Sequence, residues 1–227
     1  MPRSLEAVFF DAGETLIHPR VPLHELYMEA INRECGRAFS PGRVLRAMEE
    51  VGRALPLEVD GHFRYSDGWF EVYIHTLLDR LECPGPYDGI AGRLLELFDD
   101  PATFRVFPDA APCLEEVRRR GLKTAVVSNW GFRLSRLLDR LGLGEAFDAV
   151  VASADVRSEK PEGTIFREAL ARTGADPGRV IHVGDDAETD LEGARRAGLH
   201  ALLLDRREAH PEERSRIRSL RELLSHL

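Results

Sequence analysis

Four stretches of the chain end in residues whose types suit phosphoryl chemistry. Each lies at or soon after the end of a mostly apolar segment: Asp11, Ser128 with Asn129, Lys160, and Asp185 with Asp186. A carboxylate at the mouth of a buried strand costs desolvation free energy unless it binds or reacts with something. A carboxylate can attack phosphorus directly, while hydroxyl and ammonium groups bind anionic oxygens and further carboxylates bind a divalent metal.

The segments that would position these residues are typical of buried parallel strands. They are residues 8–12, 123–129, 147–153, 179–186 and 200–205. Amphipathic helical stretches lie around and between the last four, at 109–120, 132–142, 163–173 and 188–197. Strands alternating with helices indicate βαβ units, and apolar runs without alternation are expected where helices cover both faces of a sheet. In such a sheet, ligands bind beyond the carboxyl ends of the strands, so the polar residues should converge there.

Residues 17–103 have a different pattern. They show helical periodicity with no convincing strand, and proline and glycine interrupt it, as in "CPGP" at 83–86. We therefore expect an α/β core of residues 1–16 and 104–227, interrupted after its first strand by a helical insertion at 17–103. The C-terminal stretch "RSRIRSLRELLSHL" is predicted to be a final amphipathic helix.

Composition narrows the class of protein. The 227 residues carry a net charge of −8 and are 43% hydrophobic, which favours an acidic globular protein and disfavours nucleic-acid and anionic-membrane partners. Cys35, Cys83 and Cys113 are widely spaced and form no CxxC pair, so we expect no disulfide framework and a cytoplasmic location. No basic-then-apolar leader and no membrane-length apolar run is evident. Lys123 and Lys160 are the only lysines, which draws attention to both.

In their order and spacing, the four stretches resemble the haloacid dehalogenase superfamily of hydrolases, subfamily I. "VFFDAGETL" is similar to the family's first motif, "TAVVSN" to its second, "SEKPEGTIF" to its third and "VIHVGDDAETD" to its fourth. The family's helical type-1 cap falls between the first and second motifs, where residues 17–103 lie. The resemblance covers nearly the whole chain. It implies a Rossmann-like parallel-sheet core with an inserted cap that closes over the strand ends.

The resemblance also implies a role for each matched residue. Asp11 is the expected nucleophile, which forms an aspartyl-phosphate intermediate, and Lys160 is the cation that stabilises it. Ser128 and the backbone N–H of Asn129 are expected to bind the phosphate. The residues implied for Mg²⁺ are Asp11, Asp185, the backbone carbonyl of Gly13 and, through water, Asp190. We interpret Asp186 and Glu188 as acids at the N-terminus of the next helix.

Gly13 departs from the family pattern, since the phosphatases usually carry an aspartate there as general acid and base. Such help is worth about 10²–10⁴ in rate. Three hypotheses follow: Glu14 takes over the role, the substrate has a good leaving group, or the protein is a 2-haloacid dehalogenase-type hydrolase, because halide leaves without a proton. Asp185 and Asp186 argue against the dehalogenase, because they retain the acidic residues of the family's metal site, which a metal-free dehalogenase does not need.

The best-supported function is a Mg²⁺-dependent phosphatase acting on a small phosphorylated metabolite, as a monomer or homodimer. A second alternative is a catalytically weak protein that binds a phosphorylated ligand; Gly13 favours it and the intact Asp11 and Lys160 oppose it. Specificity is expected from the cap, where the candidates are His62, Arg64, Tyr65 and Trp69, although packing in the cap core is the favoured interpretation of these aromatics. Trp130 is a comparable candidate.

Overall fold

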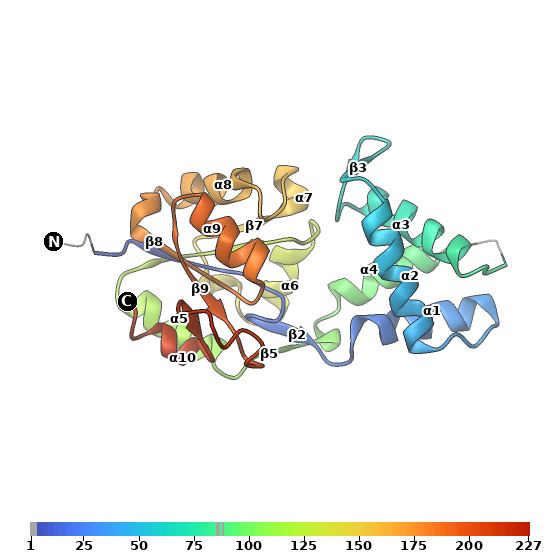
Figure 1. Ribbon diagram of the computed structural model, residues 1–227, viewed down its shortest axis with the longest axis horizontal. Helices are drawn as coiled ribbons and strands as arrows, with labels where there is room; N and C mark the ends of the chain where they lie inside the picture. The colour runs from blue at the N-terminus through green and yellow to red at the C-terminus, as the bar shows by residue number, and fades with distance from the viewer. Residues whose placement is uncertain (1–3, 85–86, 88) are drawn as a thin grey trace. The chain divides into compact units, whose positions relative to one another are not determined.

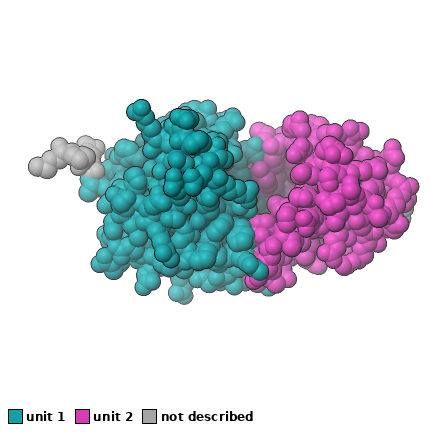
Figure 2. Space-filling model, turned by 60° about the horizontal axis from the view of Figure 1, so that its bottom comes forward, with its two compact units in different colours: residues 1–18, 105–227 teal, residues 19–104 magenta. Residues whose placement is uncertain are grey.

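The computed structural model describes residues 4–84, 87 and 89–227, and the chain divides into two compact units (Figure 2). Unit 1 consists of residues 1–18 and 105–227, and unit 2 of residues 19–104. The first boundary lies two residues later than the sequence analysis places it, and the second lies one residue later. Each unit is described by itself.

The centre of unit 1 is a parallel sheet, with strand order β10-β9-β8-β1-β6-β7 (Figure 1). Its strands are β1 (Ala7–Phe10), β6 (Lys123–Ser128), β7 (Ala149–Ala152), β8 (Val180–Gly184), β9 (His200–Leu204) and β10 (Arg216–Ile217). This confirms the predicted α/β class. The strand order reverses at β1, which pairs with both β6 and β8, so the ligand position expected for an open α/β sheet is at the carboxyl end of β1.

Helices cover both faces of this sheet. One face presents alternate residues of the strands, such as Phe9, Val127 and Leu203, to a core that also contains Ile165 and Ala194 from the helices α8 (Gly163–Thr173) and α9 (Gly193–Arg196). Figure 1 shows α5 (Ala110–Arg119) and α10 (Leu220–Leu223) on the opposite side. Coverage of both faces explains why the strands have continuous apolar sequences.

The remaining elements of unit 1 are short connections. They are α6 (Leu134–Arg140), η2 (Gly144–Ala146), α7 (Ser153–Val156), η3 (Pro177–Arg179) and the π-helical turn η4 (Ala187–Glu192). The prediction of a C-terminal helix over 214–227 was wrong for its first half. Arg216 and Ile217 pair with β9 as β10, and only Leu220–Leu223 is helical. Pairing with the sheet edge satisfies backbone groups that a helical pattern alone does not reveal.

Unit 2 is built mainly from helices: α1 (Leu23–Cys35), α2 (Pro41–Ala54), α3 (Asp67–Arg80), α4 (Ile90–Asp99) and η1 (Pro101–Thr103). Their apolar sides share one core, to which Ile31, Val44, Ile74 and Leu94 contribute. The expectation of no strand in this region was wrong. β3 (Glu58–Val59) and β4 (His62–Phe63) form a small antiparallel hairpin, in which Asp60 and Gly61 both have positive φ and make the turn that tight hairpins require. β2 (Ile17–Pro19) and β5 (Phe104–Val106), which pair with each other, lie where the chain passes between the units.

Unit 2 also contains a disulfide between Cys35 and Cys83, whose Cα atoms are 5.6 Å apart. The expectation of no disulfide was therefore wrong. Cys35 ends α1 and Cys83 is the third residue after α3, and a separation of 48 residues gives no sign that these helix ends meet. Cys113, buried in unit 1, is free. Among the described residues, no helix has the length and apolarity needed to cross a membrane.

Candidate active site

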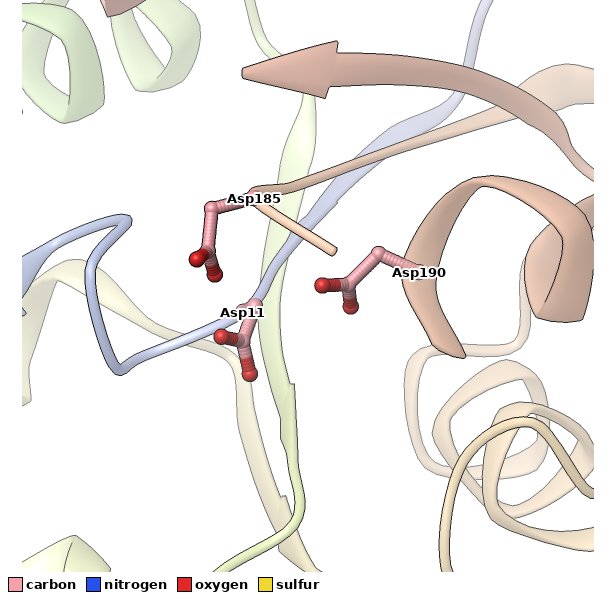
Figure 3. Close-up of side chains that lie close together, drawn as sticks. All are labelled: Asp11, Asp185 and Asp190. Carbon is pink, nitrogen blue, oxygen red and sulfur yellow. The ribbon is translucent and has the colours of Figure 1, made fainter. Parts of the chain in front are cut away.

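The candidate site lies at the carboxyl end of β1. Asp11 follows this central strand, and its backbone N–H donates a hydrogen bond of 2.9 Å to the carbonyl of Val183 on the neighbouring β8. Carboxylate oxygens of Asp11, Asp185 and Asp190 lie within 4.8 Å of one another. Figure 3 shows the three carboxyl groups facing a common space. Because β1 and β8 are neighbours in the sheet, acids that are far apart in the sequence lie close together.

Lys160 connects two of these acids. Its Nζ lies 2.6 Å from Asp11 Oδ1 and 2.5 Å from Asp190 Oδ1, and its side chain is only 3% exposed. Burial alone would lower the pKa of Lys160, but the adjacent carboxylates of Asp11 and Asp190 raise it above its ordinary value. The ammonium group therefore keeps its proton and stays positive between the two carboxylates.

Asn129 holds the backbone of Lys160 in place. Its Oδ1 accepts a hydrogen bond of 2.7 Å from the Lys160 N–H, and its Nδ2 donates one of 2.9 Å to the Lys160 carbonyl. The side chain of Asn129 is therefore engaged in positioning the lysine. Its backbone N–H is the group that the sequence analysis assigns to phosphate binding.

Asp190 accepts hydrogen bonds from three sides. Besides Lys160, His182 Nε2 lies 2.8 Å from its Oδ1, and the backbone N–H of Asp186 donates to its Oδ2 at 3.1 Å. Burial disfavours the charged form, but Lys160 and His182 outweigh it and hold the pKa of Asp190 well below its usual range. Gly184 makes room for this carboxyl group, since a Cβ there would overlap it.

Asp185 is the first residue after β8, and it is less buried than Asp11 and Asp190. Burial, together with the charges of Asp11 and Asp190, raises the pKa of Asp185 to about 7. Burial also raises the pKa of Asp11, although Lys160 partly opposes the shift. Three carboxylates that repel one another and offer hard oxygen ligands fit a Mg²⁺-like cation, which would favour their ionised forms.

Ser128 completes the pocket at the end of β6. Its hydroxyl, buried with the rest of the side chain, lies in the same cavity as Asp11 and acts to lower the pKa of that carboxyl group. A cavity of about 150 Å³ lies beside these groups, lined by Asp11, Gly13, Ser128, Asn129, Trp130, Lys160, Asp185, Asp186, Thr189 and Asp190. Its volume corresponds to several waters at about 30 Å³ each, which suits a phosphate-sized group. The structure thus brings together every residue of the predicted site.

Two neighbouring acids have other roles. Asp186 Oδ1 accepts hydrogen bonds from the backbone N–H groups of Glu188 and Thr189, at 2.9 and 2.7 Å, so it caps the turn that follows, as predicted. Glu14, considered as a substitute acid, has a left-handed φ of +52° and a carboxylate 3.6 Å from Arg207 Nη2. Glu14 is not among the described residues that line the cavity.

Of the specificity candidates in unit 2, Trp69 and Arg64 belong to its internal packing. Trp69 is buried, stacks on Tyr73 with ring centroids 5.5 Å apart, and donates from Nε1 to the Pro56 carbonyl at 2.9 Å. The guanidinium of Arg64 lies over the Trp69 ring. His62 is exposed on β4, and Tyr65 has a positive φ. Trp130, by contrast, lines the cavity in unit 1.

The sequence analysis missed His182. This side chain is fully buried in β8 and packs edge-on against Phe166, with ring centroids 5.2 Å apart. Its Nδ1 has no hydrogen-bond partner among the described residues, so its contact with Asp190 is its principal polar interaction. A histidine between apolar residues in "RVIHVGDD" was the available signal, because a buried imidazole requires a partner.

Comparison with known proteins agrees with this geometry. A family model described as haloacid dehalogenase-like hydrolase matches residues 5–198. Haloacid dehalogenase-like hydrolase domain-containing protein 3 of Mus musculus is 35% identical over 202 residues, covering 86% of this chain and 80% of that protein. The phosphoserine phosphatase of Thermus thermophilus is 29% identical over 223 residues, with 89% of each chain covered. The crystal structure of a HAD phosphatase from Thermococcus onnurineus has a TM-score of 0.72 at 27% identity, covering 98% of this chain and 97% of that one. The chain therefore belongs to the haloacid dehalogenase-like hydrolases.

Proposed function

We propose that this hydrolase is a Mg²⁺-dependent phosphatase that acts on a small phosphorylated metabolite through an aspartyl-phosphate on Asp11. The observation that carries the proposal is the buried arrangement of Asp11, Lys160 and Asp190, with Asp185 beside it. The phosphatase names of relatives, such as the Thermus protein, support it.

The polar residues around Asp11 have distinct places in the proposed reaction. Lys160, the Ser128 hydroxyl and the backbone N–H of Asn129 bind the phosphate oxygens. Asp11 attacks phosphorus, and its acyl-phosphate is then hydrolysed by water. Asp190 fixes Lys160 by its short ion pair, and His182 in turn fixes Asp190. Neutralisation of anionic oxygens by these fixed groups is the main source of rate enhancement expected here.

For the metal, we propose Asp11, Asp185 and the Gly13 carbonyl as ligands, with Asp190 acting through water. The oxygens of Asp190 already accept hydrogen bonds from Lys160, His182 and Asp186, which suits a supporting position. When bound, Mg²⁺ supplies positive charge that offsets the repulsion between the phosphate dianion and the carboxylate nucleophile.

A 2-haloacid dehalogenase is the second candidate, and Gly13 is the observation that favours it, because a halide leaves without a proton. The third candidate is a protein that binds a phosphorylated ligand without turnover. The acidic cluster of Asp11, Asp185 and Asp190 favours the phosphatase over both, because neither halide release nor simple anion binding needs three carboxylates around one space.

A phosphate-release screen over a panel of phosphorylated metabolites, with and without Mg²⁺, tests the proposal. We expect release that depends on the metal and is lost in Asp11→Asn, which keeps the side-chain shape and removes the nucleophile. Ser225→Ala, a change in an exposed residue of unit 1, is the matched control and should keep full activity. Halide release from 2-chloropropionate with EDTA present would establish the dehalogenase instead. Binding without either product would establish the third candidate.

We also propose that residues 17–103 serve as the cap that selects the substrate, and that the protein acts in the cytoplasm. The Cys35–Cys83 disulfide opposes the second of these, since reducing compartments rarely retain such bonds. Rapid alkylation of thiols in intact cells of the source organism, followed by mass mapping of Cys35, would test the location. An alkylated Cys35 would support the cytoplasm, and an intact disulfide would oppose it.

A further inference from the structure

The site has no side chain at position 13, and an aromatic ring stands next to that gap. Gly13 lines the cavity beside Asp11, and a Cβ placed on it would lie 3.6 Å from Cζ3 of Trp130, at ordinary van der Waals distance. Trp130 is held by its backbone, whose N–H and carbonyl both bond the Ser153 hydroxyl at 3.1 Å. The space beside Gly13 is therefore bordered by an aromatic ring whose backbone is anchored.

The carboxyl groups among the described lining residues all have other tasks. Asp11 is the nucleophile, Asp185 belongs to the acidic cluster, and Asp190 is bonded on both oxygens. Asp186 is used as a helix cap, with Oδ1 accepting from Glu188 and Thr189. Lys160 is held between two carboxylates at 2.6 and 2.5 Å, which makes it a poor proton donor. Within this described lining, no carboxyl group without another task remains to protonate a leaving oxygen.

This matters because phosphoryl transfer passes through a loose transition state, in which the bond to the leaving group is largely broken. The leaving oxygen then carries nearly a full negative charge. An alcohol has a pKa near that of water, about 15.7, whereas a phenol has about 10 and a carboxylic acid about 4. Without a general acid, the rate of the first step therefore depends steeply on the acidity of the leaving group.

We propose that the substrates of this site are phosphates whose leaving group departs as a stable anion, with aryl phosphates as the class that the Trp130 ring best suits. This proposal rests on the phosphatase function proposed above. Asp11 forms a bond to phosphorus as the bond from phosphorus to the aryl oxygen breaks. The electron pair leaves with the phenolate, which takes a proton from solvent after it departs.

The second step bears on the kinetics. Water attacks the aspartyl-phosphate, the Asp11 carboxylate departs, and the water's protons leave on the phosphate and in the solvent. A carboxylate at position 13 would also have activated this water, so its absence slows the second step as well. With a good leaving group, the first step outruns the second, and the phosphoenzyme accumulates.

The test uses the full chain with Mg²⁺ and four substrates: acetyl phosphate, 4-nitrophenyl phosphate, phenyl phosphate and glycerol phosphate. We expect kcat/KM for glycerol phosphate to fall about 10³-fold or more below that for phenyl phosphate, in line with the rate that general acid catalysis supplies. We also expect a burst of about one nitrophenolate per active site. Hydrolysis of glycerol phosphate within tenfold of phenyl phosphate would overturn the proposal, while failure to release phosphate from all four would overturn the phosphatase function itself.

Gly13→Asp provides the second arm, because the structure leaves ordinary contact distance for a Cβ at this position. It should raise kcat/KM for glycerol phosphate about 10²-fold and leave that for acetyl phosphate nearly unchanged. Gly13→Asn, similar in shape but without the acid, is the matched control and should give no such gain. An equal gain on all substrates, or an equal gain in both variants, would count against the proposal. Trp130→Ala should raise KM for phenyl phosphate more than for acetyl phosphate.

The phosphoserine named for the Thermus relative is an alkyl phosphate, so the experiment also separates this chain from that relative. If circular dichroism shows that Gly13→Asp does not fold, the comparison of the four substrates with the wild-type protein still tests the proposed substrate class. It requires no variant, and each of its outcomes either supports or contradicts the proposed class.

Discussion

Different interactions dominate inside each of the two units. In unit 1, the functional end of the sheet is organised by buried charges, with Lys160 paired to Asp11 and Asp190 and almost no solvent access. In unit 2, the helices share an apolar and aromatic core, in which Tyr27 meets Phe70 edge-on at 6.3 Å, and a disulfide joins two helix ends. Buried charges tolerate few substitutions because each needs its partner, whereas an apolar core accepts many residues of similar volume.

The largest effect that would test this contrast is expected for Lys160→Met. The substitution keeps the length and burial but removes the cation between two carboxylates, and breaking such a buried pair costs about 3–5 kcal/mol of unfolding free energy. We expect phosphate release to fall by about 10²–10³-fold, since one stabilising group of this kind is worth that much. Stopped assays of phosphate release and a denaturant titration measure the two effects.

Lys123→Met is the matched control, because Lys123 is the only other lysine and is exposed at the start of β6, at the opposite end of the strand from Ser128. Its ammonium group bonds the Thr173 carbonyl. We expect a small loss of stability and unchanged phosphate release. Equal losses in the two variants would show that the charge of Lys160 has no special place in the site.

A second, intermediate effect concerns Asp185 and pH. In the metal-free protein the pKa of Asp185 is raised to about 7, above the ordinary value of 3.8. The folded state therefore holds a proton that the unfolded state has lost, so the stability of the metal-free protein should fall as pH rises from about 4 to 7 and change little above that. Mg²⁺ competes with this proton. The affinity for Mg²⁺ should therefore increase about tenfold for each unit by which the pH is raised towards 7, and should level off above pH 7.

Calorimetric titration of Mg²⁺ between pH 5.5 and 8.5 measures this dependence. Asp185→Asn should weaken binding and reduce the pH dependence. Asp186→Asn should preserve both, because asparagine caps a helix about as well as aspartate. A Mg²⁺ affinity that is independent of pH in the wild-type protein would contradict the placement of Asp185 next to the ion.

The same contrast explains what could be predicted from the sequence. Strands buried on both faces have a distinctive composition, and the polar residues that end them, such as Asp11 and Asp185, lie together because parallel strands share one edge. The order of four motifs then fixed the fold class. The bonds of Asn129 to the backbone of Lys160 and of His182 to Asp190 were not predictable, since they depend on side-chain directions across neighbouring elements.

Unit 2 was harder to predict, because helical periodicity shows which faces are buried but not which helix ends meet. The hairpin of β3 and β4 has only two residues in each strand, too few for an alternating pattern. The C-terminal stretch failed for a related reason. Arg216 and Ile217 are held by the free edge of β9, a long-range pairing that local sequence does not encode.

The smallest effect on the chemistry, and the one that separates the units most cleanly, is expected for the disulfide. Cys35 and Cys83 are 48 residues apart, and the loop-closure entropy for that length corresponds to at most about 4 kcal/mol. Reduction, or Cys35→Ser, should therefore speed hydrogen exchange in α1 and α3 while leaving exchange in β1 and β6 unchanged. Cys113→Ala is the control in unit 1. Burial raises the pKa of the Cys113 thiol to about 12, so the native protein should show no thiol that reacts with a disulfide reagent until it is reduced or unfolded. Faster hydrogen exchange in β6 on reduction would show that the disulfide of unit 2 also stabilises unit 1, and so that the two units are not stabilised independently.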